Sequence, residues 1–314
     1  MISDVEKVDV KVNTSNSFKK KLSFSSLPYK KQKIVISILF LMVPVVLLTV
    51  FTYIPAIAMA GYSFTDWDGI SKVKHFVGLK NYKTIFSDVK YFEPMFVSIY
   101  YFIASFVQIA LAVIVAYLVS FGCRASNFFK SVYFFPSLIN SVAIGFIFVF
   151  FFQPGSTLDT VLSMLGLDSL TRYWLQDPKL VNISLSGVSV WRYIGYNIVM
   201  FSAAMASISP DILEAARVDG ANKWQQLIHI ILPGISTILG LQLFLSITGA
   251  LSAFEIPYIM TGGGNGSMTF IIQTVNYAFS NHRVGLASAM AMILLVLCIV
   301  ITCIQKYVFR KKGV

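Results

Sequence analysis

The chain has 314 residues, of which 56% are apolar and only 12% are charged, whereas an ordinary soluble domain has roughly 45–50% apolar and about 25% charged residues. Too few charged side chains remain to cover a water-soluble surface, which excludes an ordinary soluble domain. The 25 Lys and Arg exceed the 14 Asp and Glu and give a net charge of +11. Eight of these lysines lie in the first 33 residues, a location that favours an anionic membrane surface over nucleic acid as the partner of this charge.

Six apolar segments are long enough to cross a bilayer, which needs about 20 consecutive apolar residues in a helix. Backbone groups in lipid must hydrogen-bond within their own segment, so we expect helices. The spans are expected near residues 34–61, 96–121, 131–152, 183–208, 235–256 and 284–308. The sequence therefore predicts an all-α membrane domain over 34–309. A basic, largely disordered tail over 1–33 precedes it, and a short basic end over 310–314 follows it.

The distribution of Lys and Arg predicts the orientation of the chain in the membrane. With the N-terminus inside, sixteen of these residues lie on the inner side and eight on the outer side, and Arg192 lies within a span. Positive charge collects on the cytoplasmic side of membrane proteins. We therefore expect both termini in the cytoplasm.

Cysteine and histidine show neither a disulfide framework nor a metal site. The three cysteines form no C-x-x-C pair, and the three histidines are scattered: Cys123, Cys298, Cys303, His75, His229 and His282. We expect this chain to bind no metal.

The segment between the fourth and fifth expected spans, residues 209–233, has the pattern of two short helices. Ser209 caps the first helix and Pro210 suits its first turn. Gly220 is expected to end that helix, because the left-handed backbone conformation that commonly ends a helix strains glycine less than any other residue. Asn222 followed by Gln225 forms the outline of a capping box for the second helix.

The second of these helices has one apolar stripe, at positions i, i+3, i+4 and i+7: Trp224, Leu227, Ile228 and Ile231. Outside the bilayer such a stripe must pack against lipid headgroups, neighbouring spans or another protein. A connector that packs beneath its own helices would show the same spacing.

The same segment carries nine residues in a recognisable order: Glu214, Ala215, Ala216, Asp219, Gly220, Ala221, Ile230, Leu232 and Pro233. In order and spacing they resemble the EAA loop of membrane subunits of ATP-binding-cassette (ABC) importers. The resemblance implies the type I importer permease fold. It also implies that this loop docks in a cleft of a separate cytoplasmic ATPase, with Glu214 at the contact and Trp224 on the coupling surface.

Nucleotide chemistry is absent from the sequence. A P-loop needs GxxxxGK[ST], and the glycine cluster of residues 262–267 has no lysine. ATP and magnesium are therefore expected at partner subunits, and the chain is expected to be a transporter subunit and not an enzyme.

Two outer segments carry a second resemblance, through Ser63, Phe64, Asp66, Phe76, Gly78, Leu79, Asn81 and Tyr82, and through Thr261, Gly262, Gly263, Gly264, Ser267 and Thr269. They look like the first permease subunit of maltose- and lactose-type carbohydrate importers. This implies a bacterial plasma membrane, a second homologous permease subunit, two ATPase copies and an extracellular solute-binding protein. The second group of residues is expected to contact that binding protein, although a flexible hairpin without a partner is the alternative.

Polar residues inside spans usually face the bundle interior or a wet cavity. Tyr193, Tyr196 and Asn197 share one helical face of the fourth span, and Gln242 and Ser246 share one face of the fifth. Sugar hydroxyls need such donors and acceptors, and pyranose faces stack on aromatic rings. These five residues are the expected substrate path, with hydrogen bonding between helices as the alternative for each.

Arg192 and Glu255 lie toward the outer ends of two spans. They are expected either to form an ion pair across the bundle or to extend separately to the surface.

The function expected from these features is ATP-driven import of a sugar or oligosaccharide by alternating access. The same architecture would also serve glycerol-3-phosphate or a related polyol. An ion-coupled secondary transporter would need an ionisable residue deep in the bundle, and Arg192 and Glu255 are both off-centre.

Overall fold

The computed structural model describes residues 28–122 and 125–311, with side chains up to residue 307. Within these ranges the chain forms helices and turns, with one isolated β-bridge between Thr65 and Phe76. Residues 1–27 of the expected basic tail, residues 123–124 and residues 312–314 of the expected basic end lie outside the described residues. Contacts divide the chain into two compact units, Met1–Ala58 and Met59–Val314.

The described part of the first unit is one apolar helical run. It begins with α1 (Tyr29–Leu48), passes through a π-helical turn, η3 (Thr49–Tyr53), and enters α2 (Ile54–Tyr62), whose last residues belong to the second unit. Pro55 cannot donate a backbone hydrogen bond to the preceding turn and its ring crowds the carbonyl there, which explains the wide turn just before it. No side chain of α1 is buried. Exposed apolar surface of this extent is typical of a helix that contacts lipid or another protein surface.

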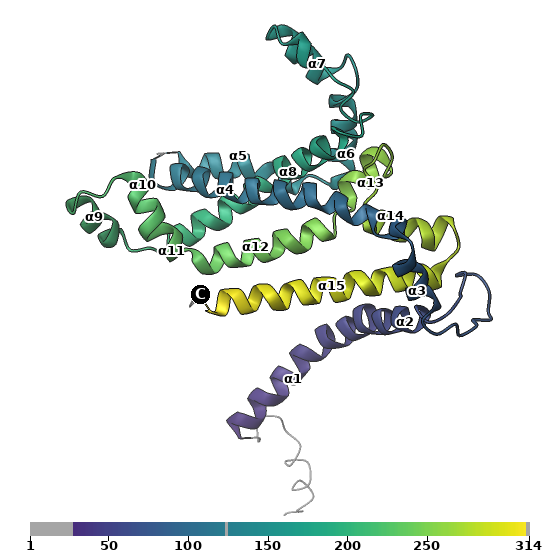
Figure 1. Cartoon of the computed structure of the whole chain (residues 1–314). Helices are drawn as coiled ribbons and strands as arrows, with labels where there is room; N and C mark the ends of the chain where they lie inside the picture. Colours follow the sequence, from purple (N-terminus) through teal and green to yellow (C-terminus); the bar gives the residue numbers. More distant parts are fainter. Residues whose placement is uncertain (1–27, 123–124, 312–314) are drawn as a thin grey trace, which may run out of the picture. The chain divides into compact units, whose positions relative to one another are not determined.

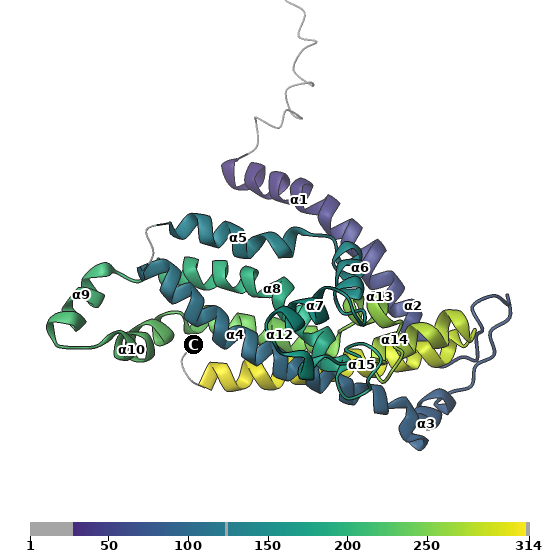
Figure 2. The same ribbon diagram turned by 90° about the horizontal axis from the view of Figure 1, so that it is seen from above.

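The second unit is built on five long helices that run side by side (Figures 1 and 2): α4 (Ser98–Gly122), α5 (Ser126–Leu138), α8 (Val181–Met205), α12 (Ser236–Leu251) and α15 (Val284–Lys311). Helix α8 packs against both α4 and α5, and α12 packs against α4 and α15. The crossing of α5 and α8 is close because Gly195 faces the backbone of Tyr133. Small residues let membrane helices approach in this way.

The third expected span, 131–152, is not one straight helix. Helix α5 ends at Leu138, and α6 (Ser141–Phe151) leaves it at an angle of 93°. Asn140 stands between them and its side-chain oxygen accepts a hydrogen bond from the Val142 amide at 2.8 Å, so it caps α6. The expected span 131–152 is therefore helical but sharply bent, because a favourable cap starts a new helix within the apolar run.

The fifth expected span, 235–256, continues further than predicted. Helix α12 ends at Leu251, and after a short break α13 (Glu255–Thr261) extends the helical run to Thr261. Helix α13 packs against α6 and α8. The break places residues 252–254 beside the ends of three helices, where they line the cavity described below.

Four helical runs of the described chain are long and apolar enough to cross a membrane: Tyr29–Tyr62, Val89–Gly122, Ser236–Thr261 and Val284–Tyr307. Two bent pairs, α5 with α6 and α8 with α9 (Pro210–Val218), raise the number to six if each pair is one span. Helix α8 alone has 25 residues, a length of about 37 Å. The all-α membrane fold predicted from the sequence is confirmed.

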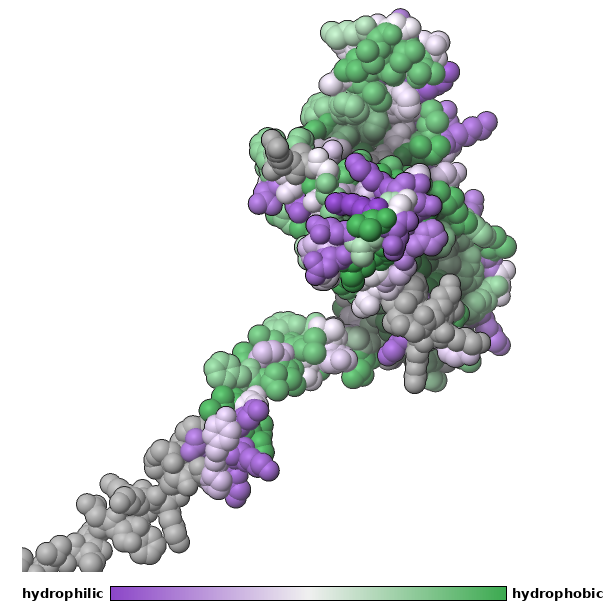
Figure 3. Space-filling model, turned by 90° about the vertical axis from the view of Figure 1, so that its left-hand side faces the viewer, coloured by the Kyte–Doolittle hydropathy of each residue, from purple (hydrophilic) through white to green (hydrophobic). Residues whose placement is uncertain are grey.

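The short elements of the second unit gather at the two ends of the bundle (Figure 1). One end carries α9, α10 (Lys223–Gln226), η7 (Leu227–Ile231) and α11 (Leu232–Gly234). The connections at the other end contain α3 (Lys80–Ser87), η4 (Val89–Tyr91), η5 (Glu93–Val97), α7 (Thr157–Met164), η6 (Asp168–Leu170), α14 (Phe270–Val275) and η8 (Asn276–Ser280). Figure 3 looks onto the first end and shows hydrophilic residues gathered there, with hydrophobic surface along the flanks of the bundle.

Candidate functional site

A cavity of about 400 Å³ lies among α4, α8, α12 and the start of α13. All five residues of the expected substrate path line it: Tyr193, Tyr196, Asn197, Gln242 and Ser246. The first three come from α8 and the last two from α12, as their helical spacing requires. The volume falls within the range of about 300–1,000 Å³ that is usual for small-molecule pockets.

Two residues that line the cavity each have a buried polar atom without a hydrogen-bond partner in the described chain. Gln242 is only 2% exposed, and its Nε2 has no hydrogen-bond partner within the described chain. The hydroxyl of Tyr101 is also buried there without a partner. Leaving a buried donor unpaired costs about 1–3 kcal/mol, so such groups in a cavity are suited to bind a polar ligand.

Aromatic rings lie beside these polar groups. Tyr101, Tyr193, Tyr196 and Phe254 all line the cavity. Phe254 stacks on Tyr258 with 4.9 Å between ring centroids, which fixes the orientation of its ring. The cavity therefore combines flat apolar faces with hydroxyl and amide groups.

An ion pair lies at the end of the cavity where α13 begins. The Arg192 guanidinium, on α8, donates from Nη1 to Oε2 of Glu255 at the start of α13, over 3.0 Å. The Arg192 side chain is 10% exposed and the Glu255 side chain 56% exposed. The guanidinium also lies over the ring of Tyr193, 4.9 Å from its centroid. The two residues therefore join α8 to α13 and do not extend separately to the surface.

The loop at the opposite end has the local structure that the sequence predicts. Ser209 accepts a hydrogen bond from the Asp211 amide, and α9 begins at Pro210. Asn222 and Gln225 exchange side-chain-to-backbone hydrogen bonds of 2.7 and 2.9 Å, which is a complete capping box. Gly220 has φ +83°, the left-handed conformation that lets α9 turn toward α10.

The predicted apolar stripe of this loop is divided between two faces. Leu227 and Ile231 are buried, whereas Trp224 is 61% exposed and Ile228 is 51% exposed. The reason is that residues 227–231 form the π-helical turn η7, which has more residues per turn than an α-helix and so moves side chains off a stripe of α-helical spacing. Leu227 and Ile231 thus pack against neighbouring helices, while Trp224 and Ile228 remain at the surface.

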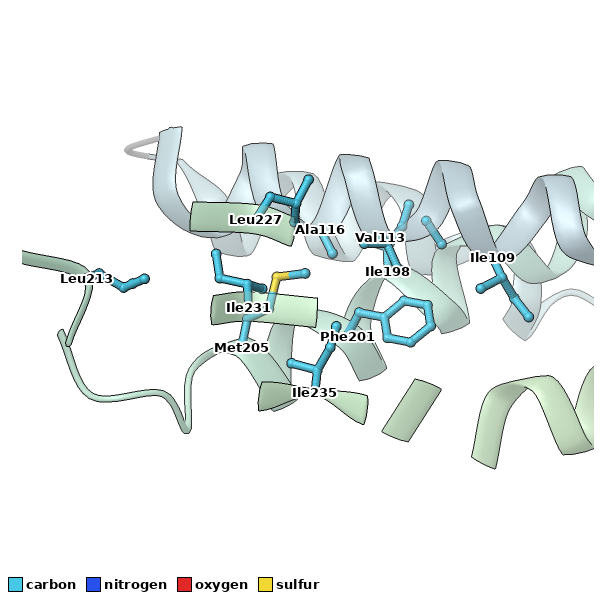
Figure 4. Packing of buried hydrophobic residues seen from close by; sticks show 11 residues of the cluster. Ile109, Val113, Ala116, Ile198, Phe201, Met205, Leu213, Leu227, Ile231 and Ile235 are labelled. Atoms are coloured by element: carbon cyan, nitrogen blue, oxygen red, sulfur yellow. The ribbon is translucent and has the colours of Figure 1, made fainter. Parts of the chain in front are cut away.

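The buried half of the loop joins the core of the bundle (Figure 4). Leu213, Leu227 and Ile231 belong to one hydrophobic cluster with residues of α4, α8 and the start of α12: Ile109, Ala112, Val113, Ala116, Ile198, Phe201, Met205 and Ile235. Glu214, Ala215 and Asp219 are exposed on the other side of α9, and Ala216 is half-buried. The loop thus presents an exposed acidic and apolar surface and is anchored to the helices that line the cavity.

The glycine-rich loop of residues 262–269 places its glycines and its hydroxyl groups in different surroundings. Gly262 and Gly263 have φ +61° and +83°, and Gly262 and Gly264 are exposed. Ser267 and Thr269, by contrast, are 0% and 1% exposed. The Ser267 hydroxyl is 2.6 Å from the Thr261 hydroxyl, and Thr269 caps α14. Both hydroxyls are therefore used inside the loop in this conformation, and their expected contact with a binding protein stays a prediction.

Comparison with known proteins gives the family. Residues 108–314 match the family described as "Binding-protein-dependent transport system inner membrane component". The chain belongs to this family. It is 33% identical, over 89% of this chain and 97% of the relative, to a probable ABC transporter permease protein of Bacillus subtilis. It is 31% identical to the multiple sugar-binding transport system permease protein of Streptococcus mutans, over 87% of this chain and 94% of the relative.

The fold of the permease is also found among solved structures. A bacterial ABC transporter involved in the import of the acidic polysaccharide alginate contains a chain that matches with a TM-score of 0.76 at 20% identity. The match covers 90% of this permease and 96% of that chain. The type I ABC importer permease fold that the EAA loop implies is confirmed, and the protein is a membrane component of a binding-protein-dependent transporter.

Helix α4 also contributes to the cavity of the permease, which was not predicted from the sequence. Tyr101, Ser105 and Gln108 all line it. Their spacing of four and then three residues places them on one face of α4, and a glutamine within an apolar span was the available signal. Among the described residues, no group of three or more His, Cys, Asp or Glu side chains is placed to hold a metal ion.

Proposed function

We propose that this permease imports a sugar or short oligosaccharide through the cavity of α4, α8 and α12. The observation that carries the proposal is the combination, in one cavity, of aromatic rings with buried polar groups that have no protein partner. Pyranose rings offer apolar faces to aromatic side chains, and their hydroxyls satisfy unpaired amides and phenols. The Streptococcus mutans relative, named for the transport of multiple sugars, supports the same substrate class.

Movement is proposed to come from separate ATPase subunits. The exposed surface that includes Glu214, Asp219 and Trp224 is the docking surface for one ATPase copy, and a second homologous permease subunit docks the other. An extracellular solute-binding protein delivers the substrate at the opposite end of the bundle, toward the exposed glycines of the 262–264 loop. In this proposal the four membrane and ATPase subunits cycle between inward-open and outward-open states.

The orientation follows from the same proposal, with both termini and the EAA loop in the cytoplasm. Val218 of α9 is 87% exposed and Met164 at the end of α7 is 81% exposed, so each is a suitable site for a single cysteine in a chain whose own three cysteines are replaced by serine. A membrane-impermeant maleimide should label Met164→Cys in intact cells, and Val218→Cys only after permeabilisation. Labelling of Val218→Cys in intact cells would contradict the orientation and the coupling role of the loop.

The coupling step is tested with Glu214→Lys in the reconstituted transporter. Charge reversal at the docking surface should abolish nucleotide-dependent uptake and the association of the ATPase while leaving membrane insertion intact. Glu93→Lys, at an exposed acidic position of η5 far along the chain from the loop, is the matched control and should retain uptake. Normal transport by Glu214→Lys would overturn the proposed coupling. Uptake that persists without nucleotide and stops with the proton gradient would indicate a secondary transporter.

A further inference from the structure

The charge of the cavity lining limits which saccharides it accepts. Of the described residues that line the cavity, Glu255 is the one with a formally charged side chain, and the rest are apolar, aromatic, hydroxyl or amide residues. A phosphate or a uronate in this cavity would meet no Lys, Arg or His of its lining. It would instead lie in the same cavity as a carboxylate of its own sign.

Arg192, which lies beside the cavity, does not provide a cation for such an anionic ligand. The Arg192 guanidinium is bound to Glu255 over 3.0 Å, lies over the ring of Tyr193 and is not part of the lining. Its charge is therefore balanced by the carboxylate before any ligand enters. Burying an anion without a paired cation is strongly unfavourable, whereas a hydroxyl needs only a neutral donor or acceptor.

The neutral part of the lining is complementary to an uncharged ligand. Gln242 and Tyr101 supply unpaired buried groups, and Asn197 and Gln108 are 4% and 8% exposed beside them. Amides and hydroxyls can both donate to and accept from sugar hydroxyls. They provide no net charge to offset that of an acidic sugar.

We infer that the cavity is specific for uncharged saccharides and rejects phosphorylated and uronic-acid sugars, and that the Arg192–Glu255 pair sets this preference. The inference rests on the proposed saccharide transport. It separates this permease from the alginate transporter that shares its fold, whose cargo is an acidic polysaccharide.

Direct binding to the intact membrane complex, with its ATPases and in nanodiscs, tests the inference without selection by the binding protein. The probes are neutral mono- to tetrasaccharides and, for each, its phosphorylated or uronic-acid counterpart, measured by calorimetry at low ionic strength. In each pair of probes, the neutral saccharide should bind at least about tenfold more tightly than its acidic counterpart. Raising the salt concentration should reduce this ratio, because Glu255 is partly exposed.

The variant Glu255→Gln removes the carboxylate and frees the charge of Arg192, so it should bring the affinity ratio of each pair close to one. Asp88→Asn is the matched control, because Asp88 also pairs with a cation, Lys90 at 2.6 Å, and does not line the cavity. It should leave the ratio unchanged.

An acidic sugar bound as tightly as its neutral counterpart by the unaltered complex would overturn the inference, whether or not Glu255→Gln folds. An unchanged ratio in a folded Glu255→Gln complex, or an equal change in Asp88→Asn, would overturn the role of the ion pair. Failure of both members of every pair to bind would overturn the proposed saccharide transport itself.

Discussion

Replacing Gly195 by alanine tests the close crossing of α5 and α8 that positions the cavity. A Cβ at residue 195 would lie 1.7 Å from the carbonyl oxygen of Tyr133. A carbon and a carbonyl oxygen approach to about 3.3 Å, so the two helices must separate by about 1.6 Å. The obstructing atom is backbone and cannot move as a side chain can, which places the cost at the upper end of overpacking, about 3 kcal/mol.

The assay is the apparent melting temperature of the detergent-purified complex, followed by size-exclusion chromatography after heating. A loss of about 3 kcal/mol should lower it by about 5–10 °C. Gly187→Ala is the control on the same helix, because a Cβ there meets nothing within 4 Å. It should leave stability unchanged or raise it by up to about 1 kcal/mol, since alanine is the better helix former.

Separation of α5 and α8 should also reduce saccharide binding, because Tyr196 and Asn197 are adjacent to the altered residue and line the cavity. Equal melting temperatures for Gly195→Ala and Gly187→Ala would refute the close backbone contact. A stable Gly195→Ala complex with normal binding would show that this crossing does not position the cavity.

Three further predictions concern single residues. Gln242→Met should weaken saccharide binding at least about tenfold while leaving melting unchanged or raising it, because the buried Nε2 has no protein partner to lose; a destabilised variant would contradict this. Gly220→Val should impair ATPase association more than Gly220→Asn, since asparagine tolerates a positive φ and β-branched valine does not; equal effects would refute the conformational argument. Hydrogen bonds from Ser71 and Ile70 lower the pKa of Asp68 to about 2 from 3.8. Because the folded-state pKa is depressed, the ionised carboxylate should stabilise the turn above about pH 4, and this stabilisation should be lost as the pH falls through about 2. Pepsin should therefore cleave the turn of Asp68→Asn faster than that of the unaltered chain near pH 4. The two cleavage rates should be equal near pH 2.

The sequence predicts features that depend on local signals. The helical character of the six apolar segments, the capping box of Asn222 and Gln225 and the terminator Gly220 each need only neighbouring residues. The structure is helical in all six segments and contains both features of the loop. The grouping of Tyr193 with Gln242 required only that polar faces of apolar helices turn inward. The transport family is confirmed, while the roles of individual residues stay predictions.

Features set by contacts between distant segments were not predictable. The burial of Leu227 and Ile231 depends on how they pack on α4 and α8, which the α-helical spacing of the loop does not reveal. Burial of Ser267 depends on the fold of the glycine loop onto Thr261. The contribution of Gln108 depends on which face of α4 meets α8.

The anchoring of Leu227 and Ile231 in the interior has a mechanical consequence. A close-packed apolar interior is barely compressible, so a force applied to the exposed side of α9 and α10 reaches α4 and α8 with little loss. The parts of those two helices that lie beyond the cluster line the cavity that is proposed to bind the saccharide. Truncating Leu227 to alanine would loosen the packing of the loop against these helices. The ATPase subunits would then hydrolyse ATP without fully moving the ends of α4 and α8 that line the cavity.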